Sequence, residues 1–80
     1  MNKSIFTNDY GVFLRVLRKA RQDAGLSQEQ LAERLGQTQT FISKCERGER
    51  RLDVVEIRCI CKAIGISFVE FIETFENALE

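Results

Sequence analysis

Apolar residues recur at intervals of three and four along most of the chain, which is the spacing of one face of an α-helix. The pattern is interrupted at four points, each by a single glycine: Gly25, Gly36, Gly48 and Gly65. A glycine at such a point can adopt the left-handed backbone conformation that ends a helix. The pattern therefore predicts five short helices and an all-α fold.

The first helix is expected to begin near Asp9 and to end at Gly25, and the fifth to run from Ser67 toward the C-terminus. Helical spacing also predicts which side chains face the core. They are Phe13, Leu14, Leu17, Ala20 and Ala24 in the first helix; Leu31, Ala32 and Leu35 in the second; Ile42 and Cys45 in the third; Val54, Ile57, Ile60, Cys61 and Ile64 in the fourth; and Phe68, Phe71, Ile72, Phe75 and Leu79 in the fifth.

Polar residues with N-capping chemistry precede the later helices. Thr38 can cap the third helix, which we expect to run through Arg47. A capping box needs a hydroxyl or carboxylate three residues before a Glu or Gln, so that each side chain bonds the other's backbone N–H. The sequence contains three such pairs, which are Ser27 with Gln30, Asp53 with Glu56, and Ser67 with Glu70.

The second and third predicted helices are joined only by Gly36 and Gln37. So short a connection makes two helices cross steeply, which is the geometry of a helix-turn-helix. Once its apolar residues are buried, the third helix presents a ridge of hydrogen-bonding side chains to solvent. A ridge one helix wide fits the DNA major groove. Its members are Gln39, Thr40, Ser43, Lys44 and Arg47.

Charge is distributed unevenly along a chain whose net charge is zero. Residues 1–52 hold ten Lys/Arg against six Asp/Glu, a balance of +4, whereas residues 53–80 hold two against six, a balance of −4. Such an asymmetry predicts that the first part faces a polyanion while the acidic end faces elsewhere. The alternative is that both parts are simply solvated mixtures of charge.

Composition narrows the class of protein further. Eighty residues, 44% of them hydrophobic, provide one compact domain spanning 1–80. No apolar run approaches the roughly 18 to 20 residues of a membrane span, and the N-terminus lacks the features of a signal peptide, so we expect a cytoplasmic protein without membrane contact. The three cysteines, Cys45, Cys59 and Cys61, are an odd number, and we interpret them as reduced, half-buried thiols.

An enzymatic role is not indicated. The chain contains no His, no Gly-rich phosphate loop and no cluster of metal-ligand type, and its acidic residues are accounted for by caps and surface. We therefore expect no metal, no cofactor and no small-molecule substrate.

The run LSQEQLAERLGQTQTFISKCERGER resembles the helix-turn-helix of the lambda repressor and Cro superfamily, the XRE family of transcriptional regulators. The matching elements are Leu26-Ser27-Gln28, Leu31-Ala32, Gly36, Ile42-Ser43 and Glu46-Arg47-Gly48. The resemblance covers residues 11–72, with the motif itself at 27–48. It implies a compact five-helix lambda-repressor-like domain that binds specific sequences of double-stranded DNA.

The resemblance also implies roles for individual residues. Gln28 would touch a phosphate and buttress Gln39, which would read a base edge, and an amide pairs best with adenine N6 and N7. Arg21 and Glu46 would form a partly buried ion pair that serves as scaffold. Together with the chemistry of the other side chains, this gives the predicted DNA-binding set: Gln28, Thr38, Gln39, Thr40, Phe41, Ser43, Lys44, Arg47, Arg50 and Arg51.

Within that set the expected contacts differ. Thr40 can meet a thymine methyl and Lys44 a guanine acceptor, while Phe41 and Ser43 can reach backbone or a thymine methyl. The arginines at the exit of the reading helix are phosphate candidates, although a merely solvated loop is the alternative for the last two. These arginines are Arg47, Arg50 and Arg51.

The acidic C-terminal helix, residues 67–79, is the candidate dimerisation element, through Phe71, Phe75 and Leu79. Two modules related by a twofold axis read a palindrome whose half-sites lie roughly 34 Å apart. The alternative is that this apolar stripe folds back onto its own core. Two other functions stay open: an antitoxin or another protein-interaction module of a toxin–antitoxin pair, and a controller protein of a restriction–modification system.

Overall fold

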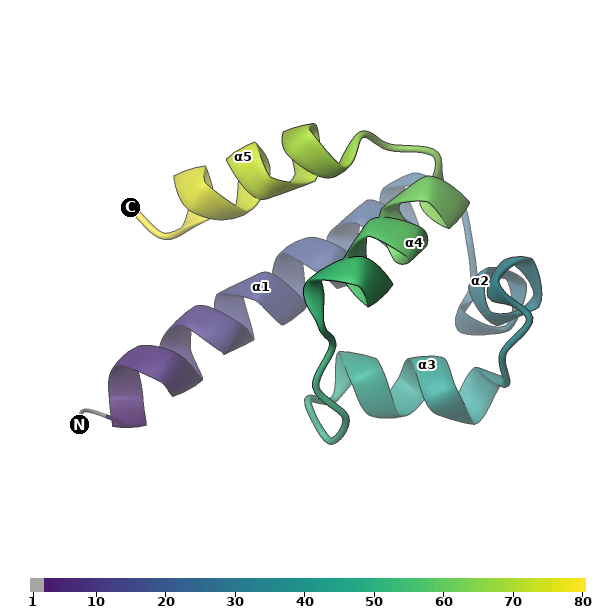
Figure 1. Cartoon of the computed structure of the whole chain (residues 1–80), viewed down its shortest axis with the longest axis horizontal. Coiled ribbons are helices and arrows are strands. Elements are labelled where there is room, and N and C mark those ends of the chain that lie inside the picture. The colour runs from purple at the N-terminus through teal and green to yellow at the C-terminus, as the bar shows by residue number, and fades with distance from the viewer. Residues whose placement is uncertain (1–2) are drawn as a thin grey trace.

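The computed structural model describes the backbone of residues 3–80 and the side chains of residues 8–80 (Figure 1). All regular secondary structure within residues 3–80 is helical, which confirms the predicted all-α class with five helices. The helices are α1 (Lys3–Asp23), α2 (Gln28–Leu35), α3 (Gln39–Glu46), α4 (Val54–Ile64) and α5 (Phe68–Ala78).

The beginning of α1 differs from the prediction. The helix starts at Lys3, not near Asp9, and Asp9 lies inside it. No proline stands in this segment, and each further residue that joins an existing helix adds a backbone hydrogen bond. The cap-like side chain of Asp9 was therefore a misleading signal for the helix start.

The caps of the later helices follow the sequence closely. Ser27 and Gln30 form a complete capping box, with N–H···O distances of 2.8 and 3.0 Å, and Asp53 and Glu56 form a second one. Ser67 accepts a hydrogen bond from the Glu70 N–H at 3.2 Å, but among residues 8–80 the return bond that would complete a third box is not made. These later helices thus begin at the residues whose side chains the sequence predicts as N-caps.

The turn after α3 requires a glycine for two reasons. Gly48 has a φ of 79°, and a Cβ built on it would lie 3.1 Å from Leu14 Cδ1 of α1. α3 ends at Glu46 with Arg47 as its C-cap, within one residue of the predicted end. A side chain at position 48 would therefore strain the backbone and press on α1.

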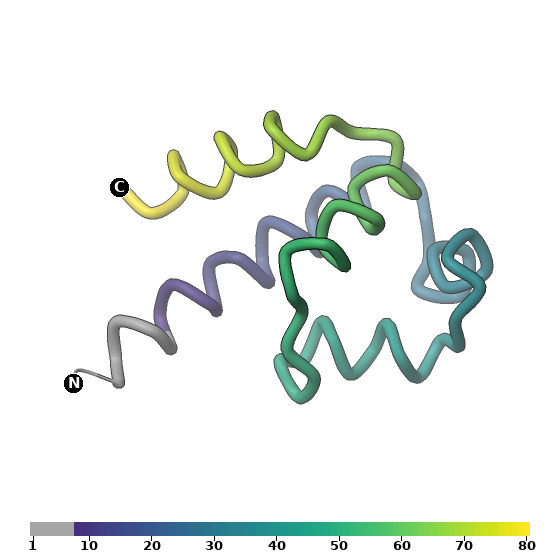
Figure 2. The backbone as a smooth tube through the Cα atoms, in the orientation of Figure 1, coloured from purple at the N-terminus to yellow at the C-terminus, as the bar shows by residue number. Residues whose placement is uncertain are grey.

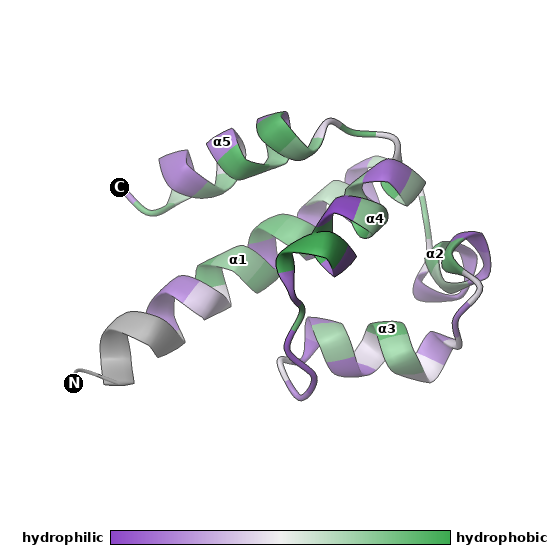
Figure 3. Cartoon of the chain, in the orientation of Figure 1, coloured by the Kyte–Doolittle hydropathy of each residue, from purple (hydrophilic) through white to green (hydrophobic). Residues whose placement is uncertain are grey.

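The helices pack around one shared core, in which α2 packs on α4 and the long helix α1 contacts both α3 and α5. α5 packs on α1 and α4, while α3 packs on α2 and α1, so α3 and α5 lie at opposite edges of the molecule (Figures 1 and 2). The core between them holds Phe13, Leu17, Leu26, Leu31, Ala32, Ile42, Cys45, Ile60, Cys61, Ile64 and Phe71, each at most 8% exposed. Figure 3 shows hydrophobic residues concentrated in α4 and the first turns of α5, and hydrophilic ones along the loop after α3.

Three predicted core residues lie outside the core: Val54, Ala24, and Ile72, which is 36% exposed on α5. Val54 is 62% exposed, because it is the first residue of α4 and precedes the turn that faces inward. Ala24 is exposed in the turn that follows α1, since the last helical residue is Asp23. All three cysteines are free thiols, as predicted, but none is half-buried as expected: Cys45 and Cys61 are buried, and Cys59 is exposed.

Candidate nucleic-acid interface

The outer side of α3 carries the ridge that the sequence predicts. Gln39, Thr40, Lys44 and Arg47 are exposed and Ser43 is half-buried, whereas Ile42 and Cys45 on the inner side are each 1% exposed. In Figure 1, α2 is seen almost end-on while α3 lies across the view, so the two helices cross steeply. This arrangement leaves one whole face of α3 uncovered at the edge of the molecule.

The first residue of α3 is held by the first residue of α2. Gln39 Nε2 donates a hydrogen bond of 2.6 Å to Gln28 Oε1. The buttress that the family resemblance implied is therefore present without DNA. Gln28 in turn donates from Nε2 to Glu46 Oε1 at 2.9 Å, a contact that sequence reasoning did not foresee.

Glu46 lies at the centre of a buried charged cluster and is 5% exposed. Arg21 donates to it from Nε at 2.6 Å and from Nη2 at 3.0 Å, which is the predicted ion pair, and Arg18 Nε lies 3.5 Å away. Burial alone would raise the pKa of Glu46, but the hydrogen bonds from Arg21 and Gln28 and the nearby positive charges outweigh it and lower the pKa. Glu46 is therefore ionised at neutral pH.

The three arginines at the exit of α3 are exposed, and each has a partner. Arg47 bonds to Glu49 at 2.7 Å and to the Ser43 hydroxyl. Arg50 pairs with Glu56 at 2.7 Å and lies over the Phe41 ring at 4.9 Å, and Arg51 lies over the ring of Tyr10 at 4.3 Å. Exposed pairs of this kind are weak, so a phosphate group can compete for these guanidinium groups.

Two further predicted contact residues differ in how far they are fixed, since in the described part of the chain Thr38 has a hydrogen-bond partner and the Lys44 side chain is unpaired. The Thr38 hydroxyl accepts a hydrogen bond from the Phe41 N–H at 3.1 Å, so its oxygen caps α3 while its own proton stays available for donation. The Lys44 side chain makes no ion pair within residues 8–80, so its ammonium is free to approach an anion.

The connection from α3 to α4 is fastened to α1 by a residue that the sequence analysis overlooked. The Leu52 N–H donates to the Tyr10 hydroxyl at 3.2 Å, and the Tyr10 ring carries Arg51. The only signal in the sequence is a lone tyrosine near the first apolar positions, and nothing there indicates a partner 42 residues away.

The predicted dimerisation residues of α5 fall into two groups. Phe71 is 2% exposed and packs edge-to-face on Phe13 at 5.9 Å between ring centroids, so it belongs to the core of its own chain. Phe75 and Leu79 are half-buried. The exposed apolar residues of this helix are instead Val69, at 66%, and Ile72, at 36%.

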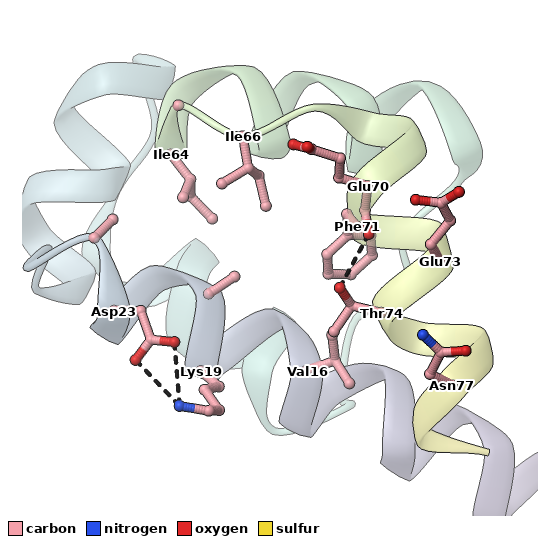
Figure 4. A pocket seen from close by; sticks show the side chains of 13 residues that line it. Val16, Lys19, Asp23, Ile64, Ile66, Glu70, Phe71, Glu73, Thr74 and Asn77 are labelled. Carbon is pink, nitrogen blue, oxygen red and sulfur yellow. Dashed lines mark hydrogen bonds and ion pairs between the residues drawn. The ribbon is translucent and has the colours of Figure 1, made fainter. Parts of the chain in front are cut away.

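A groove of about 890 Å³ separates α1 from α5, at the edge away from α3 (Figure 4). Among residues 8–80, Lys19 is the one basic residue that lines it, and it is paired with Asp23 at 3.1 Å. Two glutamates, Glu70 and Glu73, line the other side. Its acidic lining makes it unsuited to a polyanion.

None of the helices among the described residues is long and apolar enough to cross a membrane.

The chain is similar to known DNA-binding regulators over most of its length. A family model described as Helix-turn-helix matches residues 17–71. An uncharacterized HTH-type transcriptional regulator, y4dJ, of Sinorhizobium fredii is 35% identical over 54 residues, which cover 68% of this chain and 70% of that protein. An XRE-family like protein from Pseudomonas syringae pv. tomato has a similar structure, with a TM-score of 0.89, 40% identity, and coverage of 98% of this chain and 95% of that one. The restriction-modification controller protein C.Esp1396I gives a TM-score of 0.80 at 30% identity, with 86% of this chain and 88% of that chain covered.

Proposed function

Because this chain belongs to the helix-turn-helix family of lambda repressor and XRE type, it is a DNA-binding transcriptional regulator, and we propose that it acts as a homodimer on a palindromic operator. The observation that carries the proposal is the exposed ridge of α3, whose first residue, Gln39, is already held in place by Gln28. A preorganised reading side chain loses less conformational entropy when it binds.

Within this proposal, α3 enters the major groove with Gln39 as the principal base reader. Its amide suits adenine, while Thr40 and Lys44 read neighbouring bases. The other members of the predicted set contact or neighbour the DNA backbone, and the arginines among them supply most of the salt-dependent affinity. They are Gln28, Thr38, Phe41, Ser43, Arg47, Arg50 and Arg51.

The dimer is proposed to form through α5. Val69 and Ile72 are its exposed large apolar residues, half-buried Phe75 lies on the same helix, and half-buried Leu79 is its C-cap. Phe71 is no longer part of the proposed surface, because it is used within its own core. α5 lies at the edge opposite α3, so the pairing surface and the reading helix do not compete for the same space (Figure 1).

The test is selection of binding sites from a random DNA pool by the purified protein at two salt concentrations. We expect a palindrome whose half-sites lie about one helical turn apart and whose enrichment falls steeply with salt. No enrichment at either concentration, from protein that is folded by circular dichroism, would refute the proposal.

Two substitutions then separate reading from anchoring on the selected site. Gln39→Ala should relax the preference at one base pair of each half-site by about tenfold, whereas Arg47→Ala should weaken all sequences alike. Gln22→Ala, an exposed amide on α1 outside both the DNA-binding set and the proposed dimer surface, is the matched control and should change neither quantity. If the effects of the first two variants are interchanged, the assignment of the two residues is wrong.

One specific role is favoured by a structural similarity, that of controller protein in a restriction–modification system. The similarity to C.Esp1396I, which extends over 86% of this chain, supports it. This role predicts genes for a methyltransferase and an endonuclease beside this one, with the selected operator upstream of them. An adjacent toxin gene would instead favour the antitoxin alternative.

A further inference from the structure

A continuous line of hydrogen bonds runs from the buried interior to the reading ridge. It begins at Arg21, 8% exposed, passes through Glu46, 5% exposed, and Gln28, and ends at the exposed Gln39. The three successive bonds measure 2.6, 2.9 and 2.6 Å. Side chains of α1, α2 and α3 are thereby joined in one chain of donors and acceptors.

The direction of this chain is determined at its buried end. An ionised carboxylate offers only acceptors, so the atom of Gln28 beside Glu46 must be its NH₂ group. Gln28 consequently turns its oxygen toward Gln39, so Gln39 must donate to that oxygen from its own NH₂ group. One of the two Nε2 protons of Gln39 is used in this bond, while the second proton and Oε1 remain for DNA.

That remaining pattern matches one purine better than the other. Adenine offers N7 as an acceptor and the N6 amino group as a donor, so the free N–H and Oε1 of Gln39 can satisfy both. Guanine offers acceptors at both N7 and O6, and Oε1 would face O6 without a proton between them. If the amide were turned over, an N–H would face the exocyclic position, where guanine has its acceptor.

We propose that Glu46, held by Arg21, is a positioning residue for base recognition: it fixes which way round the Gln39 amide meets DNA and thereby favours adenine over guanine. The inference rests on the proposed function, since it takes Gln39 as the base reader. Arg21 and Glu46 thus have a role beyond the scaffold role that the sequence predicts for them.

The test compares two duplexes that carry the selected operator and differ only in adenine or guanine at the base pair assigned to Gln39. Wild-type protein should prefer adenine. Glu46→Gln keeps the shape of the side chain but can donate or accept, so the adenine preference should fall by about tenfold. Glu29→Gln is the matched control, because Glu29 is exposed on α2 and makes no ion pair within residues 8–80, and it should keep the preference.

A second variant separates positioning from general damage to the fold. Combining Glu46→Gln with Gln28→Glu moves the acceptor-only group one step along the chain, so Gln39 must again donate to it. Overall affinity falls in this variant because a negative charge approaches the phosphates, but the adenine preference should return. A merely structural role of Glu46 gives no such recovery.

If Glu46→Gln does not fold, the double variant Arg21→Met with Glu46→Met replaces it, since a neutral pair of similar volume is tolerated where a lone buried charge is not. A tenfold loss of adenine preference in this folded variant supports the proposal. An unchanged preference in either folded variant, or a loss that Gln28→Glu does not restore, overturns it. Failure of wild-type protein to select any site would instead refute the proposed function itself.

Discussion

The glutamates at the α3 edge and at the α5 edge of the molecule differ in burial and in pairing. At the α3 edge, Glu46 is buried and bonded to Arg21 and Gln28. At the α5 edge, Glu70, Glu73 and Glu76 are exposed and make no ion pair within residues 8–80. The Glu46 carboxylate holds its neighbours in place, while the α5 glutamates only make the local surface charge negative.

This difference shows why the zero net charge says little about the partner of the protein. The acidic residues of α5 balance basic residues of the other edge in the net charge, but the two groups lie at opposite edges of the molecule. Since charges more than about 8 to 10 Å apart are largely screened at physiological salt, DNA approaching α3 encounters mainly the local basic side chains. The first consequence to test is that identical changes at the two edges have unequal effects.

The largest contrast is expected between Glu46→Ala and Glu73→Ala. The first leaves Arg21 buried without its anion and should lower the free energy of unfolding by about 3 to 5 kcal/mol. The second removes an exposed charge and should change it by less than about 0.5 kcal/mol. Urea unfolding followed by circular dichroism, at one fixed protein concentration, measures both, and equal losses would contradict the contrast.

A smaller effect is expected from charge on the exposed apolar surface of α5. Val69→Glu adds a fifth acidic residue to residues 67–80. It should raise the dissociation constant of the proposed dimer at least tenfold, about 1.4 kcal/mol, while the chain stays folded. Val55→Glu is the matched control, because Val55 on α4 is 65% exposed and Val69 66%. Sedimentation equilibrium distinguishes the two variants, and equal weakening by both would assign the interface elsewhere.

Low pH should destabilise the fold through protonation of Glu46 at the α3 edge. The pKa of Glu46 is lower in the folded chain than its ordinary value of 4.5, so its stabilising contribution is complete above about that pH and is lost as the pH falls through the folded value. The free energy of unfolding should therefore decline below pH 4.5. The decline should be shallower in the variant with Arg21→Met and Glu46→Met, and an identical pH profile in that variant would show that other groups are responsible.

The smallest effect is expected at the exposed pair of Arg50 and Glu56. Glu56→Gln removes the ion pair but keeps an oxygen for the Asp53 N–H, so the free energy of unfolding should change by less than about 1 kcal/mol. Release of Arg50 should strengthen DNA binding slightly and equally for all sequences. A gain confined to one operator sequence would mean that Arg50 reads bases.

Much of the fold could be predicted from local chemistry. Caps at Ser27, Thr38 and Asp53 and the glycines after the helices act within four residues of themselves, so the sequence alone carries their signal. The start of α1 could not be placed in the same way. Asp9 has capping chemistry whether or not the helix continues before it, and the outcome depends on the rest of the helix.

The site was predictable only in part, for a related reason. Burial of Ile42 and Cys45 determines which face of α3 is free, so the ridge follows from periodicity. The bond from Gln28 to Glu46 and the bond from Leu52 to Tyr10 join residues 18 and 42 positions apart. Such contacts depend on how whole helices pack, and no local pattern contains that information.

The three cysteines allow the rate at which this structure opens to be measured by thiol labelling. Cys59 is exposed and should react with a thiol reagent at once, whereas Cys45 and Cys61 are buried, and burial raises the pKa of Cys61 to about 11. The buried thiols can be modified only when the chain opens, so their labelling rates report how often it does. Because Cys45 lies on α3 and Cys61 on α4, the two rates reveal whether the reading helix detaches from the rest of the core before the chain unfolds as a whole.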